Sequence, residues 1–226
     1  LLSGTGNLER LKAFQIGAFY VQDPAARLAV LAADIRPGSR VLDVCAAPGG
    51  KSFAAAMAMG DRGEIVSCDL HENKLKRIRE SAVRLGVSSI QTEAADGRQC
   101  RPEWRNRFDA VLVDAPCSGL GILRKKPDIR RKKADSLFAL PVLQNAILDN
   151  AAGYVRPGGT LLYSTCTILP EENEGVTDAF MGLHPEFSKE SFTLPGPIGR
   201  TDGQAALWPH LHGTDGFYIC RMTRRV

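Results

Sequence analysis

The feature that most constrains the fold of this chain is the alternation of short apolar runs with segments of helical periodicity. Five runs predict strands, at Arg40–Val44, Glu64–Cys68, Ser89–Ala94, Phe108–Val113 and Thr160–Ser164. Helices are predicted before, between and after them, over Ala25–Ala33, Lys51–Met59, Glu72–Leu85, Leu137–Val155 and Pro170–Leu183. Because such alternation builds a parallel sheet with helices on both faces, the sequence predicts a doubly wound, Rossmann-like α/β fold.

The end of the chain departs from this pattern. The apolar runs Ala205–Leu211 and Phe217–Met222 flank a turn rich in glycine and aspartate, which predicts an antiparallel hairpin. With this hairpin the predicted sheet has seven strands, most of them parallel. The segment Ser188–Gln204 carries no recognisable pattern, and we expect a loop there.

Composition is ordinary for a soluble globular protein. The 226 residues are enough for one α/β domain, and 44% are hydrophobic and 24% charged. No apolar run approaches a membrane span and no leader resembles a signal peptide, so the expected location is the cytoplasm. The six cysteines form no C-x-x-C pair and lack histidines at zinc-ligand spacing, so we expect reduced thiols and no metal site.

Positive charge is concentrated in one segment. Arg124–Lys133 has seven basic residues and one acid, a net charge of +6, whereas the whole chain carries +4. The rest of the chain is therefore at −2, and the cluster is a local patch of the kind that binds polyanions. A solvated surface loop is the alternative. The residues predicted to contact RNA are Arg124, Lys125, Lys126, Arg130 and Arg131.

Acidic residues and a glycine-containing loop follow the predicted strands. In open α/β sheets, ligands bind beyond the carboxyl ends of the strands. Asp43 ends the first strand and is followed by the loop Cys45, Ala46, Ala47, Pro48, Gly49, Gly50 and Lys51; Asp69, Asp96 and Asp114 follow the next three strands. The loop lacks the G-x-G-x-x-G pattern of pyrophosphate binding, whereas an acid at Asp69 suits ribose hydroxyls. The pattern favours S-adenosylmethionine as cofactor.

Two cysteines follow the fourth and fifth predicted strands. Cys117 stands in Asp114-Ala115-Pro116-Cys117, and Cys166 in Ser164-Thr165-Cys166. Two thiols at the carboxyl ends of two strands can face one pocket, although a buried, inert cysteine is the common alternative. Beside a methyl donor they suggest methylation of a pyrimidine at carbon 5, since a thiolate added to carbon 6 makes carbon 5 nucleophilic.

Three long motifs then identify a family. VLDVCAAPGGKS, DAPCSGLGILRKKPDIR and YSTCTILPEENE closely resemble the RNA 5-methylcytosine methyltransferases of the RsmB/NSUN family, and most closely its bacterial 16S ribosomal RNA branch. The resemblance extends from Gln22 to the hairpin at Phe217. It implies that Cys166 is the nucleophile and that Cys117 assists breakdown of the covalent adduct.

The same resemblance implies roles for the cofactor residues. Cys45–Lys51 would line the methionine part of the cofactor, Asp69 would hold the ribose, and Asp96 would lie on the adenine side. Asp114 would lie between cofactor and cytosine, and Lys51 near the thiols. Strand position alone allows either cysteine to be the nucleophile, so this assignment depends on the resemblance.

The resemblance also sets the expected organisation. Residues 1–23 correspond to the end of a linking region, and residues 24–226 to the catalytic domain. The NusB-related RNA-binding domain of full-length relatives lies outside this sequence. We therefore expect a monomer that binds cofactor but holds RNA weakly.

Three other readings remain open at this stage. A nicotinamide dehydrogenase shares the fold class, although the absent G-x-G-x-x-G and the paired thiols disfavour it. A non-catalytic RNA-binding or ribosome-assembly factor would need neither thiol. A methyltransferase acting on transfer RNA instead of ribosomal RNA is compatible with all the motifs.

Overall fold

The structure, a computed structural model of the chain, describes residues 6–131 and 138–226. Its central sheet contains eight strands within these residues, and seven of them follow the order β3-β2-β1-β4-β5-β10-β6, with β9 paired to β10. The parallel strands are β1 (Arg40–Asp43), β2 (Glu64–Asp69), β3 (Ile90–Ala94), β4 (Phe108–Asp114) and β5 (Val155–Thr165). The predicted doubly wound α/β class is confirmed.

The antiparallel strands form the other edge of the sheet. Strand β10 (Phe217–Arg224) pairs antiparallel with β5, with β6 (Phe187–Lys189) and with β9 (Gln204–Leu207). The predicted hairpin is thus confirmed as β9 and β10, while the short helix α7 (Pro209–His212) occupies its connection. The sheet has one strand more than predicted because the three residues of β6 also pair with β10.

One sequence-based expectation is wrong. The segment Ser188–Gln204 is not a plain loop, because it contains β7 (Phe192–Leu194) and β8 (Gly199–Thr201), which form a separate two-stranded sheet. Phe192 and Leu194 are buried against the core, and this burial holds the small hairpin in place.

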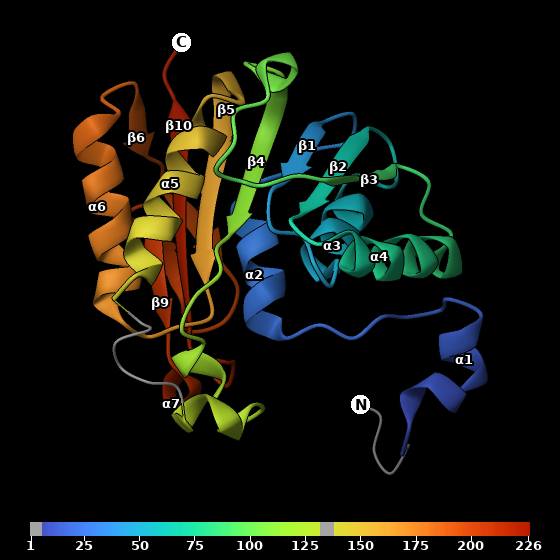
Figure 1. Cartoon of the computed structure of the whole chain (residues 1–226). Helices are drawn as coiled ribbons and strands as arrows, with labels where there is room; N and C mark the ends of the chain where they lie inside the picture. The colour runs from blue at the N-terminus through green and yellow to red at the C-terminus, as the bar shows by residue number, and fades with distance from the viewer. Residues whose placement is uncertain (1–5, 132–137) are drawn as a thin grey trace.

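Helices cover both faces of the sheet. Helices α5 (Leu140–Ala152) and α6 (Glu174–Leu183) pack on one face, and α2 (Pro24–Ala32) and α3 (Gly50–Ala58) pack on the other, as Figure 1 shows. Helix α4 (Glu72–Leu85) covers the edge near β2 and β3. The remaining helical segments are short: η1 (Leu8–Arg10), α1 (Lys12–Gln15), η2 (Pro102–Trp104), η3 (Leu120–Ile122), η4 (Pro127–Arg131) and η6 (Pro170–Glu172).

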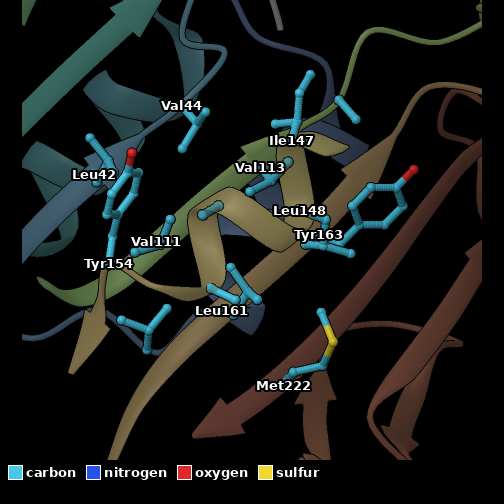
Figure 2. Close-up of a cluster of buried hydrophobic side chains, with 14 of the residues drawn as sticks. Leu42, Val44, Val111, Val113, Ile147, Leu148, Tyr154, Leu161, Tyr163 and Met222 are labelled. Atoms are coloured by element: carbon cyan, nitrogen blue, oxygen red, sulfur yellow. The ribbon is translucent and has the colours of Figure 1, made fainter. Parts of the chain in front are cut away.

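The alternation of side chains along each strand builds the two cores. Val111 and Val113 of β4 face α5, whereas Leu112 between them faces α2 and α3. Figure 2 shows the first of these cores, in which Leu148 of α5 packs over β4 and β5 beside Tyr163. All five of these side chains are fully buried. The two rigid cores fix the carboxyl ends of the parallel strands, where the candidate site lies.

Candidate active site

The two cysteines that the sequence singled out come together. Cys166 directly follows β5 and Cys117 lies three residues beyond β4, and these strands are parallel neighbours with Asp114 opposite Ser164. Their sulfur atoms are 3.4 Å apart, within hydrogen-bonding distance for thiols. The structure thus confirms that both thiols face one site.

The two thiols differ in acidity. The hydrogen bond from Cys117 lowers the pKa of Cys166, and the Lys51 ammonium lowers it further, against burial and the Asp114 carboxylate. The same thiol–thiol hydrogen bond raises the pKa of Cys117 above its ordinary value, and burial and Asp114 add to this effect. The pair therefore favours a thiolate at Cys166 and a protonated thiol at Cys117, which suits Cys166 as the nucleophile.

Lys51 joins the cofactor loop to the cysteines. It is the second residue of α3, and its side chain is only 9% exposed. Its ammonium lies 2.5 Å from Asp114 Oδ2 and 5.2 Å from the centre of the Phe217 ring. Asp114 Oδ1 accepts a hydrogen bond from the Ser164 hydroxyl at 2.9 Å. Both charged groups are therefore held in place beside the thiols.

The loop between β1 and α3 is built around Gly49. This residue has φ of 103°, and a Cβ there would lie 2.8 Å from the Phe53 ring, so only glycine fits. Behind the loop lies Asp43, which is fully buried and accepts a hydrogen bond from the Ser52 hydroxyl at 2.7 Å. Its Oδ1 has no hydrogen-bond partner among the described residues, and burial raises the pKa of Asp43 to about 6. We did not select Asp43 from the sequence, although an acid ending the first strand was a signal for it.

A cavity of about 700 Å³ runs along the carboxyl ends of the strands. Of the predicted cofactor residues, Cys45, Ala47, Asp69, Asp96 and Asp114 line it together with both cysteines, whereas Ala46, Pro48, Gly49, Gly50 and Lys51 do not. Its lining also includes Leu70, Lys126 and Ile129. A second cavity of about 210 Å³ adjoins the other side of the Cys45–Lys51 loop, where Asp43, Lys51 and Gln22 line it. Within the part of the chain that the structure describes, the buried side-chain nitrogen of Gln22 has no hydrogen-bond partner.

The two acids after β2 and β3 are bound to nearby residues. Asp69 Oδ1 accepts a hydrogen bond from the His71 backbone and lies 3.2 Å from the Lys74 ammonium. Asp96 is bonded to the Arg98 guanidinium, which lowers the pKa of Asp96 to about 2. Both acids line the larger cavity, as expected. Their ribose and adenine roles stay predictions.

The basic segment divides into two groups. Lys125 forms ion pairs with Asp23 and with Asp215, the latter at 2.7 Å, so its charge is matched within the protein. Arg124 is largely exposed and lies 3.5 Å from Asp215. Lys126, Arg130 and Arg131 are exposed, in or beside η4. The light-green segment that contains η4 lies below the end of β4 in Figure 1. Lys132 and Lys133 lie outside the described residues.

Within residues 6–131 and 138–226, no three histidine, cysteine, aspartate or glutamate side chains cluster as metal ligands would. Among the helices that the structure describes, none has the length and hydrophobicity needed to cross a bilayer.

Comparison with known proteins identifies the class. A solved structure of NSun6 from Pyrococcus horikoshii with SFG has a TM-score of 0.83 and 30% identity, covering 96% of this chain and 56% of that one. Another structure, titled PH0851, has a TM-score of 0.89 and 36% identity, covering 97% and 50%. The fold is that of a Rossmann-like, S-adenosylmethionine-dependent methyltransferase.

The family follows from the sequence comparison. The model for 16S rRNA methyltransferase RsmB/F matches residues 30–223, and the chain belongs to this family. A Bacillus subtilis protein named "Probable ribosomal RNA small subunit methyltransferase B" is 43% identical over 219 residues, which is 94% of this chain and 49% of that protein. The chain thus spans about half the length of the curated relatives it matches. Family membership excludes the dehydrogenase reading.

Proposed function

We propose that this domain transfers a methyl group from S-adenosylmethionine to carbon 5 of a cytosine in ribosomal RNA, through a covalent bond between cysteine and carbon 6. The observation that carries the proposal is the thiol pair, with sulfurs 3.4 Å apart beside the cofactor cavity and with opposite pKa shifts. Ribosomal RNA is proposed as substrate because the family and the matching relatives are named for its methylation.

The residues present fit the cofactor. The unpartnered, buried Oδ1 of Asp43 and the close-packed Gly49 are features expected where a ligand's polar end meets a tight loop. Cys45–Lys51 would line the methionine part, Asp69 would hold the ribose and Asp96 would lie on the adenine side. When bound, S-adenosylmethionine supplies an electrophilic methyl group.

The first chemical step belongs to Cys166. Its thiolate adds to carbon 6 of the cytosine, and the electrons of the 5,6 double bond move to carbon 5, which then takes the methyl group. Lys51 stabilises the thiolate before attack, and Asp114, held by Lys51 and Ser164, is placed to bond the cytosine. The base must leave its stack to reach the thiols at the end of the cavity.

The second step releases the product. Solvent water takes the proton from carbon 5, the electron pair left on carbon 5 restores the 5,6 double bond, and the bond between Cys166 and carbon 6 breaks with its electron pair returning to the Cys166 sulfur. Cys117 assists because its protonated thiol lies within hydrogen-bonding distance of the departing sulfur. The two cysteines thus act in sequence on the same bond.

The decisive experiment is methyl transfer to ribosomal and transfer RNA transcripts with single cysteine variants. Cys166→Ala should lower the methylation rate by about a thousandfold or more. Cys117→Ala should instead accumulate a covalent RNA–protein adduct, which a denaturing gel detects. Cys100→Ala is the matched control, since Cys100 is exposed away from the cavity. An active Cys166→Ala variant would refute the nucleophile assignment, and methylation of transfer RNA alone would refute the substrate.

A further inference from the structure

The loop that carries Cys117 is held on both sides of the cysteine by one buried carboxylate. Ser118 donates its backbone N–H to Glu172 Oε2 at 2.8 Å. Gln144 Nε2 donates to the same oxygen at 2.8 Å and to the Pro116 carbonyl at 3.0 Å. The residues before and after Cys117 are therefore both fastened to Glu172, one directly and one through Gln144.

The loop that carries Cys166 is held in the same way by the next residue. Thr165 donates its hydroxyl hydrogen to Asn173 Oδ1 at 2.5 Å, and Asn173 Nδ2 donates to the Thr167 carbonyl at 3.2 Å. The Ser118 and Thr167 hydroxyls also bond to each other at 2.6 Å, which ties the two cysteine loops together directly. The residues on both sides of Cys166 thus converge on Asn173.

These contacts belong to the interior of the protein. The side chains of Gln144, Glu172 and Asn173 are almost completely buried, and the Tyr163 hydroxyl donates to the Glu172 carbonyl at 2.7 Å. Gln144 is part of α5 and Tyr163 part of β5, so both anchors stand on rigid elements. Glu172 and Asn173 are consecutive residues, so the two cysteine loops are anchored to the same short stretch of backbone.

The arrangement is a poor way to gain stability. Glu172 Oε2 receives two hydrogen bonds, while Oε1 is buried with no partner among the described residues. A buried carboxylate loses its hydration, and an oxygen buried without a partner among the described residues adds to that cost. A carboxylate kept there is better explained by what it orients than by what it contributes to folding.

We propose that Glu172 and Asn173 are positioning residues, which fix the two cysteine loops and thereby the separation of the Cys117 and Cys166 sulfurs. The effect of this positioning on catalysis rests on the proposed function. Glu172 holds the loop of the releasing thiol, and Asn173 holds the loop of the attacking thiol. The two residues therefore affect different halves of the reaction.

Phenylarsine oxide tests the thiol geometry without RNA or cofactor. Arsenic forms one bond to each sulfur, and its oxygen leaves as water with the two thiol protons, so tight capture requires sulfurs that lie close together. In a Cys100→Ser background, we expect the full chain to bind the arsenical in a 1:1 complex that Cys117→Ser abolishes. Glu172→Ala should weaken capture by about tenfold or more, which is a loss that titration measures directly.

Glu172→Gln separates hydrogen bonding from charge. Its side-chain oxygen can accept from both Ser118 and Gln144, so capture should stay within about twofold of the parent chain. Glu171→Ala is the matched control, because Glu171 is the exposed neighbour. Unchanged capture by a folded Glu172→Ala variant, or loss of capture by Glu172→Gln, would overturn the proposal. If Glu172→Ala does not fold, Gln144→Met removes the Pro116 side of the network and is judged by the same criterion.

Methyl-transfer assays then test whether Glu172 and Asn173 affect different steps of the reaction. Glu172→Ala should accumulate the covalent RNA adduct and lower kcat with little change in KM for RNA, whereas Asn173→Ala should slow adduct formation itself. Equal adduct levels in both variants would overturn this division. If the parent chain did not methylate cytosine, the proposed function would be wrong, but arsenical binding would still test the positioning role of Glu172. The failure of one proposal can therefore be distinguished from the failure of the other.

Discussion

The two sides of the active site are built from contacts of very different range. On the cofactor side, the carboxylates of Asp69 and Asp96 bond to groups two to five residues away in the chain. On the thiol side, the contacts of Cys117, Ser118 and Asp114 join residues 49, 54 and 50 positions apart. Cofactor residues can therefore be oriented locally, whereas the thiol pair exists only when the whole sheet has folded.

This difference predicts that changes on the thiol side act on the reaction and changes on the cofactor side act on binding. Lys51 stands where the two sides meet, since it starts from the cofactor loop and pairs with Asp114. It should therefore give the largest effect of the variants that keep both cysteines.

Lys51→Met should lower kcat/KM near pH 7 by about a hundredfold. Lys51 lowers the pKa of Cys166, so its loss should also move the rising limb of the pH–rate profile to higher pH. Single-turnover methylation across pH 6 to about 10 measures both effects. The control is Lys76→Met, on the exposed face of α4. A lower rate with the limb unmoved would show that Lys51 acts on cofactor binding alone.

Asp43→Asn should stabilise the protein in a pH-dependent way. Burial raises the pKa of Asp43 from 3.8 to about 6, so the folded state loses stability as pH rises from about 4 to 6, and the charged carboxylate then costs about 3 kcal/mol. Asparagine avoids this cost. The Tm advantage of Asp43→Asn over the parent chain should therefore grow between about pH 4 and 6 and stay level above about pH 6.

The exposed Asp202 supplies the control for this measurement, as Asp202→Asn. A Tm difference between Asp43→Asn and the parent chain that stays constant with pH would contradict the assignment. It would mean that Asp43 keeps its charge at no cost, through Lys51.

Asp69→Ala should weaken S-adenosylmethionine binding by about tenfold, the effect of one lost charge-assisted contact. Asp96→Ala should cost only about threefold, because the Asp96 carboxylate is already bonded to Arg98. Isothermal titration calorimetry distinguishes the two. A larger loss of S-adenosylmethionine affinity with Asp96→Ala than with Asp69→Ala would contradict the proposal that Asp69 makes the stronger contact with the cofactor.

The smallest effect is expected at the exposed cations. Replacing Arg130 and Arg131 with alanine should weaken RNA binding a few-fold and reduce the salt slope of log K by about 1.4, for two phosphate contacts to a single strand. Fluorescence anisotropy with labelled RNA at several salt concentrations measures the slope. Arg77→Ala, an exposed cation on α4, is the control. An unchanged salt slope would show that Arg130 and Arg131 do not contact RNA phosphates.

The range of the contacts also explains what the sequence could predict. Helix α4 has the predicted bounds, because the periodicity of apolar residues is a local signal. Strand β6 and the β7–β8 hairpin were missed, since strands of three residues carry almost no pattern. Their pairing depends on β10 and on buried Phe192 and Leu194.

The candidate site follows the same rule. The loop from Cys45 to Lys51 and the acids at strand ends were predictable because each marks the end of its own strand. The meeting of the thiols followed from parallel strand order. The roles of Gln144 and Glu172 were not predictable, because their contact joins side chains 28 residues apart inside the core.

Lys125 has a consequence for how any mutational scan of this surface is interpreted. Asp23 begins α2, Asp215 lies just before β10, and Lys125 joins both to the basic segment. An alanine at this position leaves Asp23 without a cation among the described residues, leaves Asp215 with Arg124 alone, and loosens the junction of three chain segments. A survey of basic residues will therefore record Lys125 as a strong RNA contact even if no phosphate ever touches it.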